Sequence, residues 1–151
     1  GSEMCIRDRF GNRYAVDWFV EHEWNGEQIG VVYCDITGLK KVNDEQGHEA
    51  GDRLIIRACE CLAGVFKGYG LYRIGGDEFL VLCLGIEEKD LREHVEKLHM
   101  DMKEHQVTMA VGMIWKEHGP KDIDLLLNES ERLMYEDKDR YYKEHGLKRR
   151  R

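Results

Sequence analysis

Apolar residues recur along the chain in two rhythms, one typical of helices and one typical of buried strands. Over 49–66 they fall three or four positions apart, which predicts an amphipathic helix. Ile29–Ile36 is almost continuously apolar, which favours a strand buried on both faces. By the same criteria we expect further helices over 12–24, Leu39–Gln46, 89–105 and 122–145, and further strands over 71–74, 79–84 and 107–115.

The order of these elements predicts the fold class. Strands and helices alternate irregularly, and two short strands are joined across Gly75 and Gly76, which is a hairpin signal. The pattern therefore predicts an α/β (α+β) domain with a mixed or mainly antiparallel sheet rather than a doubly wound parallel one. A length of 151 residues suits one domain with a core of its own.

Charge and composition exclude several classes of protein. Twenty-three Lys and Arg stand against thirty Asp and Glu, and the net charge of −7 argues against a protein that coats nucleic-acid polymers. We find no apolar run near the roughly 20 residues of a membrane helix. Five cysteines without a CxxC pair and seven histidines without zinc-site spacing indicate reduced thiols in a cytoplasmic protein, not a disulfide framework or zinc site.

The two ends of the chain stand apart from the periodic pattern. Gly1-Ser2 has the form of an expression scar, and residues 4–9 show no apolar period. A foreign origin is one interpretation of this leader. We therefore divide the chain into a leader at 1–10, a domain at 11–147 and a basic tail at 148–151.

Acidic residues occur at two places in the sequence where burying an ionised carboxylate would cost free energy. Asp35 ends the apolar run of a predicted central strand, and Asp77 and Glu78 follow two glycines at the tip of the predicted hairpin. If strand and hairpin are neighbours, Asp35 and Asp77 face one another as hard oxygen ligands for Mg²⁺. The glycines permit a positive φ or the close approach of a ligand. An exposed turn with solvated acids is the alternative.

Polar residues with nucleotide-binding chemistry gather between these acids. Asn43 and Asp52 carry the amide and carboxylate that would hydrogen-bond the edge of a guanine. Lys40 offers a point charge for a phosphate. The alternative is that Asn43 to Gly47 simply ends a helix.

Four sequence blocks, in this order and spacing, resemble the diguanylate cyclase (GGDEF) domain family. They read DITGLKKVND at 35–44, GHEAGD at 47–52, GGDEF at 75–79 and MYEDK at 134–138. The resemblance spans about residues 11 to 146. It implies a five-stranded, mainly antiparallel central sheet flanked by helices, similar to adenylyl cyclase and polymerase palm domains.

The resemblance also implies roles for individual residues. Asp35, the carbonyl of Ile36 and Asp77 would hold Mg²⁺ (or Mn²⁺). The catalytic set would be Asp77, Glu78 and Lys40, and the substrate-binding set Asn43, Asp52, Leu39, Lys40, Lys138, Gly75 and Gly76. Asn43 and Asp52 would bind guanine, while Lys40 and Lys138 would contact the β and γ phosphates. The implied activity is condensation of two GTP into cyclic di-GMP with release of pyrophosphate.

That reaction implies partners for the chain. Each domain offers one GTP site, so a homodimer is needed for turnover. In this family a separate sensory domain usually imposes the dimer, and no part of these 151 residues fits one. The chain is thus expected to be the cytoplasmic catalytic part of a larger sensor, one that is itself soluble or membrane-anchored.

Several positions depart from the family pattern. The family's Asp-x-Leu-Thr-Gly segment is missing from the leader, and Leu39 replaces a phenylalanine. Tyr142 stands where many members carry a phosphate-contacting arginine. Phe66 and Tyr69 replace the Arg and Asp of the product-binding inhibitory site, so no product inhibition is expected through it. These departures leave open an alternative, a weak or inactive GTP-binding regulatory module.

Overall fold

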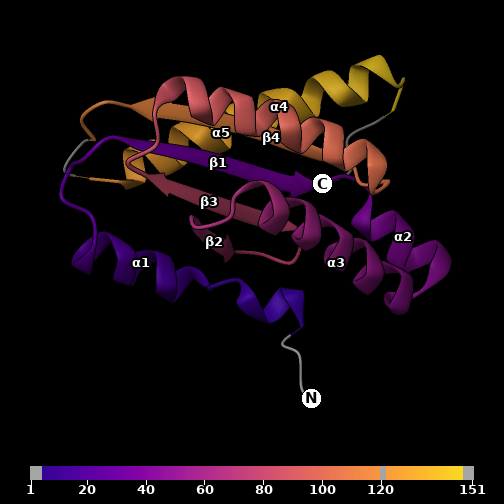
Figure 1. Ribbon diagram of the computed structural model, residues 1–151. Helices are drawn as coiled ribbons and strands as arrows, with labels where there is room; N and C mark the ends of the chain where they lie inside the picture. The colour runs from indigo at the N-terminus through magenta and orange to yellow at the C-terminus, as the bar shows by residue number, and fades with distance from the viewer. Residues whose placement is uncertain (1–4, 120–121, 148–151) are drawn as a thin grey trace.

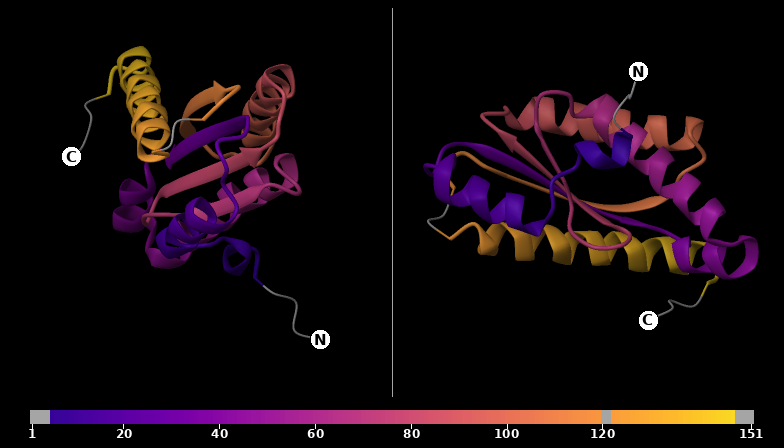
Figure 2. Two further views of the ribbon diagram at one scale, coloured as in Figure 1. Left: turned by 90° about the vertical axis from the view of Figure 1, so that its left-hand side faces the viewer. Right: turned by 90° about the horizontal axis from the view of Figure 1, so that it is seen from below.

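A four-stranded antiparallel sheet lies between two pairs of helices in the computed structural model, which describes residues 5–119 and 122–147 (Figures 1 and 2). Strand β1 runs through the middle of the sheet, paired with β3 on one side and β4 on the other. Short β2 forms the edge beyond β3. The strands are β1 (Ile29–Ile36), β2 (Gly70–Arg73), β3 (Glu78–Leu84) and β4 (Met109–Lys116).

The helices form one layer on each face of the sheet. Helices α3 and α4 pack on one face, and α1 and α5 on the other, so the core consists of two apolar clusters separated by the sheet (Figure 2). Helix α2 leads directly into α3 at one end of β1 (Figure 1). The helices are α1 (Arg13–His22), α2 (Leu39–Gln46), α3 (His48–Val65), α4 (Glu88–Glu104) and α5 (Asp124–Glu144), preceded by a 3₁₀ turn, Ile6–Arg9.

Alternation along β1 decides which side chains meet α5. Val32 and Cys34 belong to the cluster under α3 and α4, while Val31 and Tyr33 belong to the cluster under α1 and α5. Because side chains of a strand alternate between faces, Asp35 projects to the α5 side, next to Tyr33. The functional end of β1 therefore lies beneath α5.

Local signals account for where several helices begin and end. Asn12 caps α1, since its side-chain oxygen accepts a hydrogen bond of 3.0 Å from the amide of Ala15. Gly47, at a φ of 89°, ends α2, and its amide donates to the carbonyl of Asn43 at 3.0 Å. The helix-ending role expected for the Asn43 to Gly47 segment is therefore confirmed.

The predicted elements are all present, and the mainly antiparallel α+β class is confirmed. The expectation of a five-stranded sheet is wrong for the residues described. The apolar pattern supports four strands, and the fifth was implied by resemblance alone. Among the described residues between β4 and α5, none is assigned to a strand. Across the described residues as a whole, no helix combines the length and apolar character that crossing a bilayer requires.

Candidate active site

Three carboxylates meet where β1 ends beside the β2–β3 hairpin. Asp35 pairs with Glu78 in the register of β1 and β3, and the amide of Ile36 donates to the carbonyl of Asp77 at 2.8 Å. Oxygen atoms of Asp35, Asp77 and Glu78 all lie within 4.8 Å of one another. Asp35 and Asp77 thus come together as the sequence predicts. Asp77 and Glu78 are half-buried, which disfavours the alternative of a freely solvated turn.

Asp35 is the most buried of the three acids. Its residue is only 3% exposed, and its Oδ2 accepts a hydrogen bond of 3.0 Å from the ammonium of Lys138 on α5. Burial and the nearby charge of Asp77 raise the pKa of Asp35 to about 6, although Lys138 acts in the opposite direction. The carboxylate therefore carries a charge that its protein surroundings compensate incompletely.

The donor set fits a hard divalent cation. Oδ1 of Asp35 is buried and has no hydrogen-bond partner among the described residues. A buried acceptor without a partner is costly unless something else satisfies it. Three carboxylates of this kind supply the hard oxygen ligands that Mg²⁺ and Mn²⁺ take in proteins.

A cavity of about 1150 Å³ opens beside the three acids. It extends past the first turn of α2 to the first half of α3 and to the C-terminal part of α5. The predicted site residues that line it are Asp35, Ile36, Leu39, Lys40, Asp77, Glu78 and Lys138. The structure therefore brings together the predicted metal ligands, both predicted phosphate contacts and Leu39.

Four further cationic side chains, besides Lys138, line this cavity. Arg53 and Arg57 on α3 face it together with Lys40 and Lys41 on α2. Among the described residues, none of these four cations forms a hydrogen bond or ion pair. Sequence reasoning identified Lys40 but missed the arginines, although their spacing of four places them on one face of a helix. The cavity can accept an anion despite the net charge of −7.

The two predicted guanine contacts lie outside the cavity lining. The side chain of Asn43 packs against Gly51, where a Cβ would collide with its amide. Asp52 is 56% exposed, and its Oδ1 lies 3.5 Å from the guanidinium of Arg7 in the leader. Both residues sit at the α2–α3 corner, and their role in binding guanine stays a prediction.

Gly75 and Gly76 form the hairpin tip rather than the cavity wall. Neither has a positive φ, so the expectation that these glycines serve to allow left-handed backbone is wrong. The amides of Ile74 and Gly75 both donate to the carbonyl of Glu78, and this bonding closes the turn without left-handed backbone. A Cβ on Gly76 would meet nothing within 4 Å, which leaves open space for the close approach of a ligand.

Two residues that the sequence analysis did not single out extend the acid cluster, since Tyr33 contacts Glu78 directly and Glu131 is joined to it through Tyr33. The hydroxyl of Tyr33 lies 2.8 Å from Oε2 of Glu78 and 2.9 Å from Oε2 of Glu131 on α5. A signal for both was available. Tyr33 precedes Asp35 by two positions, and Glu131 precedes Lys138 by seven, so each shares a face with a recognised residue.

Comparison with known proteins agrees with this geometry. A family model described as "Diguanylate cyclase, GGDEF domain" matches residues 8–143. The chain belongs to the GGDEF domain family. The matched region contains all of the described sheet and every residue of the acid cluster.

Relatives of this GGDEF domain carry different activities in their names. The chain is 30% identical to the cyclic di-GMP phosphodiesterase PdeR of Escherichia coli (strain K12), a match covering 85% of this chain and 21% of the relative. It is also 30% identical to the diguanylate cyclase DgcP of the same organism, over 74% of this chain and 36% of the relative. The chain thus spans well under half the length of these curated relatives.

Solved structures share the fold. The FimX GGDEF domain from Pseudomonas aeruginosa has a TM-score of 0.76 at 16% identity, and the match covers 91% of this chain and 93% of that one. The GGDEF domain of DgcB from Caulobacter crescentus, in complex with c-di-GMP, has a TM-score of 0.73 at 20% identity, covering 93% and 89%. At these identities the likeness establishes the fold of the GGDEF domain and nothing finer.

Proposed function

We propose that this GGDEF domain is a diguanylate cyclase that condenses two GTP into cyclic di-GMP and releases two pyrophosphates. The observation that carries the proposal is the meeting of Asp35, Asp77 and Glu78 within 4.8 Å beside a cavity lined by cations. Carboxylates that hold a cation next to positive side chains suit the transfer of a nucleotidyl group from a triphosphate.

Asp35, Asp77 and the carbonyl of Ile36 are the proposed ligands of Mg²⁺ or Mn²⁺. When bound, the cation lowers the pKa of the attacking 3′-hydroxyl and neutralises charge on the departing pyrophosphate. The buried Oδ1 of Asp35, which lacks a partner among the described residues, supports this assignment. Glu78 stands beside these ligands as a catalytic carboxylate.

The cations of the cavity are the proposed triphosphate contacts. Lys40 and Lys138 line the cavity together with the acids and are assigned to the β and γ phosphates. An ammonium has three hydrogens, so Lys138 can keep its bond to Asp35 while it donates to a phosphate oxygen. Leu39, Gly75 and Gly76 complete the proposed substrate contacts.

Base recognition is assigned to Asn43 and Asp52. An amide and a carboxylate match the donors and acceptors of a guanine edge. Their place at the corner of α2 and α3, with Gly51 making room for the Asn43 amide, supports the assignment.

Turnover needs two copies of the chain. In each half of the reaction the 3′-oxygen of one GTP bonds to the α-phosphorus of the other, and the bond from that phosphorus to the pyrophosphate oxygen breaks. One domain binds one GTP, so a two-fold homodimer must bring two sites face to face. We further propose that a sensory domain in a longer cytoplasmic or membrane-anchored protein imposes this dimer.

Product formation tests the proposal directly. The chain is incubated with GTP and Mg²⁺ or Mn²⁺ at several protein concentrations, and nucleotides are separated by chromatography. We expect cyclic di-GMP and pyrophosphate, with a rate that rises more steeply than linearly in protein. Asp77→Ala should abolish the product, and activity that persists in that variant contradicts the assigned role of Asp77.

A second candidate is a GTP-binding regulatory module without turnover. Two observations favour it: Asp52 is engaged by Arg7, and Tyr142 lines the cavity where an additional cation is common in the family. Calorimetry with GTP separates the two functions, because binding without product formation at any protein concentration supports the module.

A further inference from the structure

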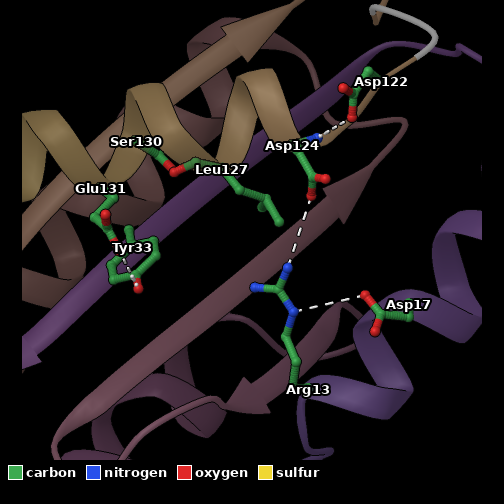
Figure 3. A network of polar contacts seen from close by, with 8 residues as sticks. All are labelled: Arg13, Asp17, Tyr33, Asp122, Asp124, Leu127, Ser130 and Glu131. Carbon is green, nitrogen blue, oxygen red and sulfur yellow. Dashed lines mark hydrogen bonds and ion pairs between the residues drawn. The ribbon is translucent and has the colours of Figure 1, made fainter.

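The hydroxyl of Tyr33 lies between two carboxylates that come from different elements. It is 2.8 Å from Oε2 of Glu78 on β3 and 2.9 Å from Oε2 of Glu131 on α5. Tyr33 itself is 5% exposed, so solvent offers its hydroxyl little alternative. Figure 3 shows Tyr33 on β1 directly beneath Glu131 of the helix.

Close packing of α5 on the sheet brings these groups together. Gly112 of β4 pairs with Tyr33 of β1, and a Cβ on Gly112 would collide with the backbone of Ser130 and Met134. The missing side chain therefore lets α5 approach the sheet next to Glu131. Two turns later on the same helix, Lys138 reaches Asp35.

The hydroxyl has one hydrogen and two acceptors. A phenol keeps its hydrogen at neutral pH, and both neighbours are carboxylate oxygens, so the hydroxyl acts as the donor to them. It donates fully to Glu78 or to Glu131 at any one time. When the hydroxyl donates to Glu78, it competes for that carboxylate with a cation bound among Asp35, Asp77 and Glu78.

We propose that Glu131 is a positioning residue that accepts the Tyr33 hydroxyl hydrogen and so frees the Glu78 carboxylate for the divalent cation. Without Glu131, turning Glu78 to the cation would leave a buried donor without a partner, which is unfavourable. The inference rests on the proposed function in one respect, that the acid cluster binds a divalent cation, and it adds Glu78 to the ligands proposed there because its carboxylate lies in the same cluster.

Mn²⁺ binding to the intact chain, measured by calorimetry without nucleotide, tests the proposal. Glu131→Ala should weaken Mn²⁺ binding on the order of tenfold, as the loss of an outer-shell partner typically does. Glu131→Gln keeps an acceptor and should stay within about threefold of the wild type. Glu136→Ala, which makes the same truncation on the exposed face of α5, is the matched control and should change nothing.

A double-mutant cycle tests whether Glu131 acts by accepting the Tyr33 hydrogen or only by packing. Tyr33→Phe removes the competing donor, so it should bind Mn²⁺ at least as tightly as the wild type. Adding Tyr33→Phe to Glu131→Ala should restore the lost affinity. Circular dichroism and a melting curve accompany each variant, and the Tyr33→Phe measurement stands by itself if Glu131→Ala does not fold.

Failure of the inference and failure of the proposed function give different results. A wild-type chain that binds no Mn²⁺ contradicts the cation site itself. If the wild type binds Mn²⁺ but its affinity is unchanged by Glu78→Gln or by Glu131→Ala, only the role of Glu131 is overturned. The same holds if Tyr33→Phe weakens Mn²⁺ binding. Equal loss in Glu131→Gln and Glu131→Ala also overturns it, because charge rather than hydrogen-bond acceptance would then be responsible.

Discussion

Lys138 and Asp35 form an ion pair across 103 positions of sequence, with the ammonium 3.0 Å from Oδ2 of the carboxylate. The Lys138 side chain is 15% exposed, so the pair is shielded from water on most sides. Breaking such a buried pair by removing one partner leaves a charge without compensation, unlike the loss of a surface pair. Helix α5 thereby supplies positive charge to an acid cluster built on the sheet.

Lys138→Met should destabilise the domain at neutral pH in the absence of divalent cations. The expected loss is about 3 kcal/mol in the free energy of unfolding, because the carboxylate of Asp35 stays buried without the ammonium of Lys138. Urea unfolding in the presence of a chelator measures it. Lys143→Met, on an exposed part of α5, is the control. Added Mn²⁺ should recover more stability in Lys138→Met than in the wild type, and equal stability of variant and wild type would contradict the compensation.

The pKa of Asp35 predicts how stability depends on pH. Its pKa is raised from 3.8 to about 6 by burial and by Asp77, so the folded state holds this proton more tightly than the unfolded state does. The resulting stabilisation is complete below pH 3.8 and is lost as the pH rises through about 6. Asp35→Asn removes the titration, so its stability relative to the wild type should increase between pH 4 and 7.

Urea unfolding of wild type and Asp35→Asn over this pH range, in a chelating buffer, isolates the contribution of Asp35. Groups that do not interact with Asp35 cancel in the difference. A difference that is flat with pH would show that Asp35 titrates at its ordinary value.

Sequence patterns predicted the elements better than the contacts between them. The bounds of Ile29–Ile36 and Leu39–Gln46 were predicted to the residue, because each ends at a polar residue or a glycine that interrupts the apolar pattern. The meeting of Asp35 and Asp77 was also predicted, since both lie at the ends of neighbouring strands. The contact of Tyr33 with Glu131 was missed because it depends on how α5 is seated over the sheet. That seating is a tertiary property, which no local period reveals.

Gly112 illustrates such a tertiary requirement, and Gly64 provides its opposite. A Cβ on Gly112 would collide with the Ser130 carbonyl and the Met134 amide, whereas a Cβ on Gly64 in α3 meets nothing within 4 Å. Gly112→Ala should cost about 1–3 kcal/mol in the free energy of unfolding by overpacking. Gly64→Ala should stabilise by about 0.5–1 kcal/mol, since alanine is the better helix former.

Both glycine variants are compared by urea unfolding under one set of conditions. Gly112→Ala should also weaken Mn²⁺ binding, because displacement of α5 moves Lys138 and Glu131 away from the acid cluster. A Gly112→Ala protein as stable as the wild type would contradict the close packing of α5 on β4.

The leader reaches the residue proposed to bind guanine, and this contact makes a last prediction. Oδ1 of Asp52 lies 3.5 Å from the guanidinium of Arg7, and the two side chains are 56% and 35% exposed. Such a surface pair is weak and is screened by salt. Arg7→Ala should therefore strengthen binding of a non-cleavable GTP analogue by only about two- to threefold at low ionic strength. Arg9→Ala, which alters the neighbouring leader arginine, is the matched control.

Calorimetry at two salt concentrations and in an Asp52→Asn background completes this test. The effect of Arg7→Ala should vanish at high salt, where the pair is already screened. It should also vanish in Asp52→Asn, because the carboxylate that Arg7 contacts is then gone. If Arg7→Ala strengthens binding equally in both backgrounds, the leader acts on the nucleotide through a route other than Asp52. If Asp52→Asn itself leaves affinity unchanged, Asp52 does not bind the base.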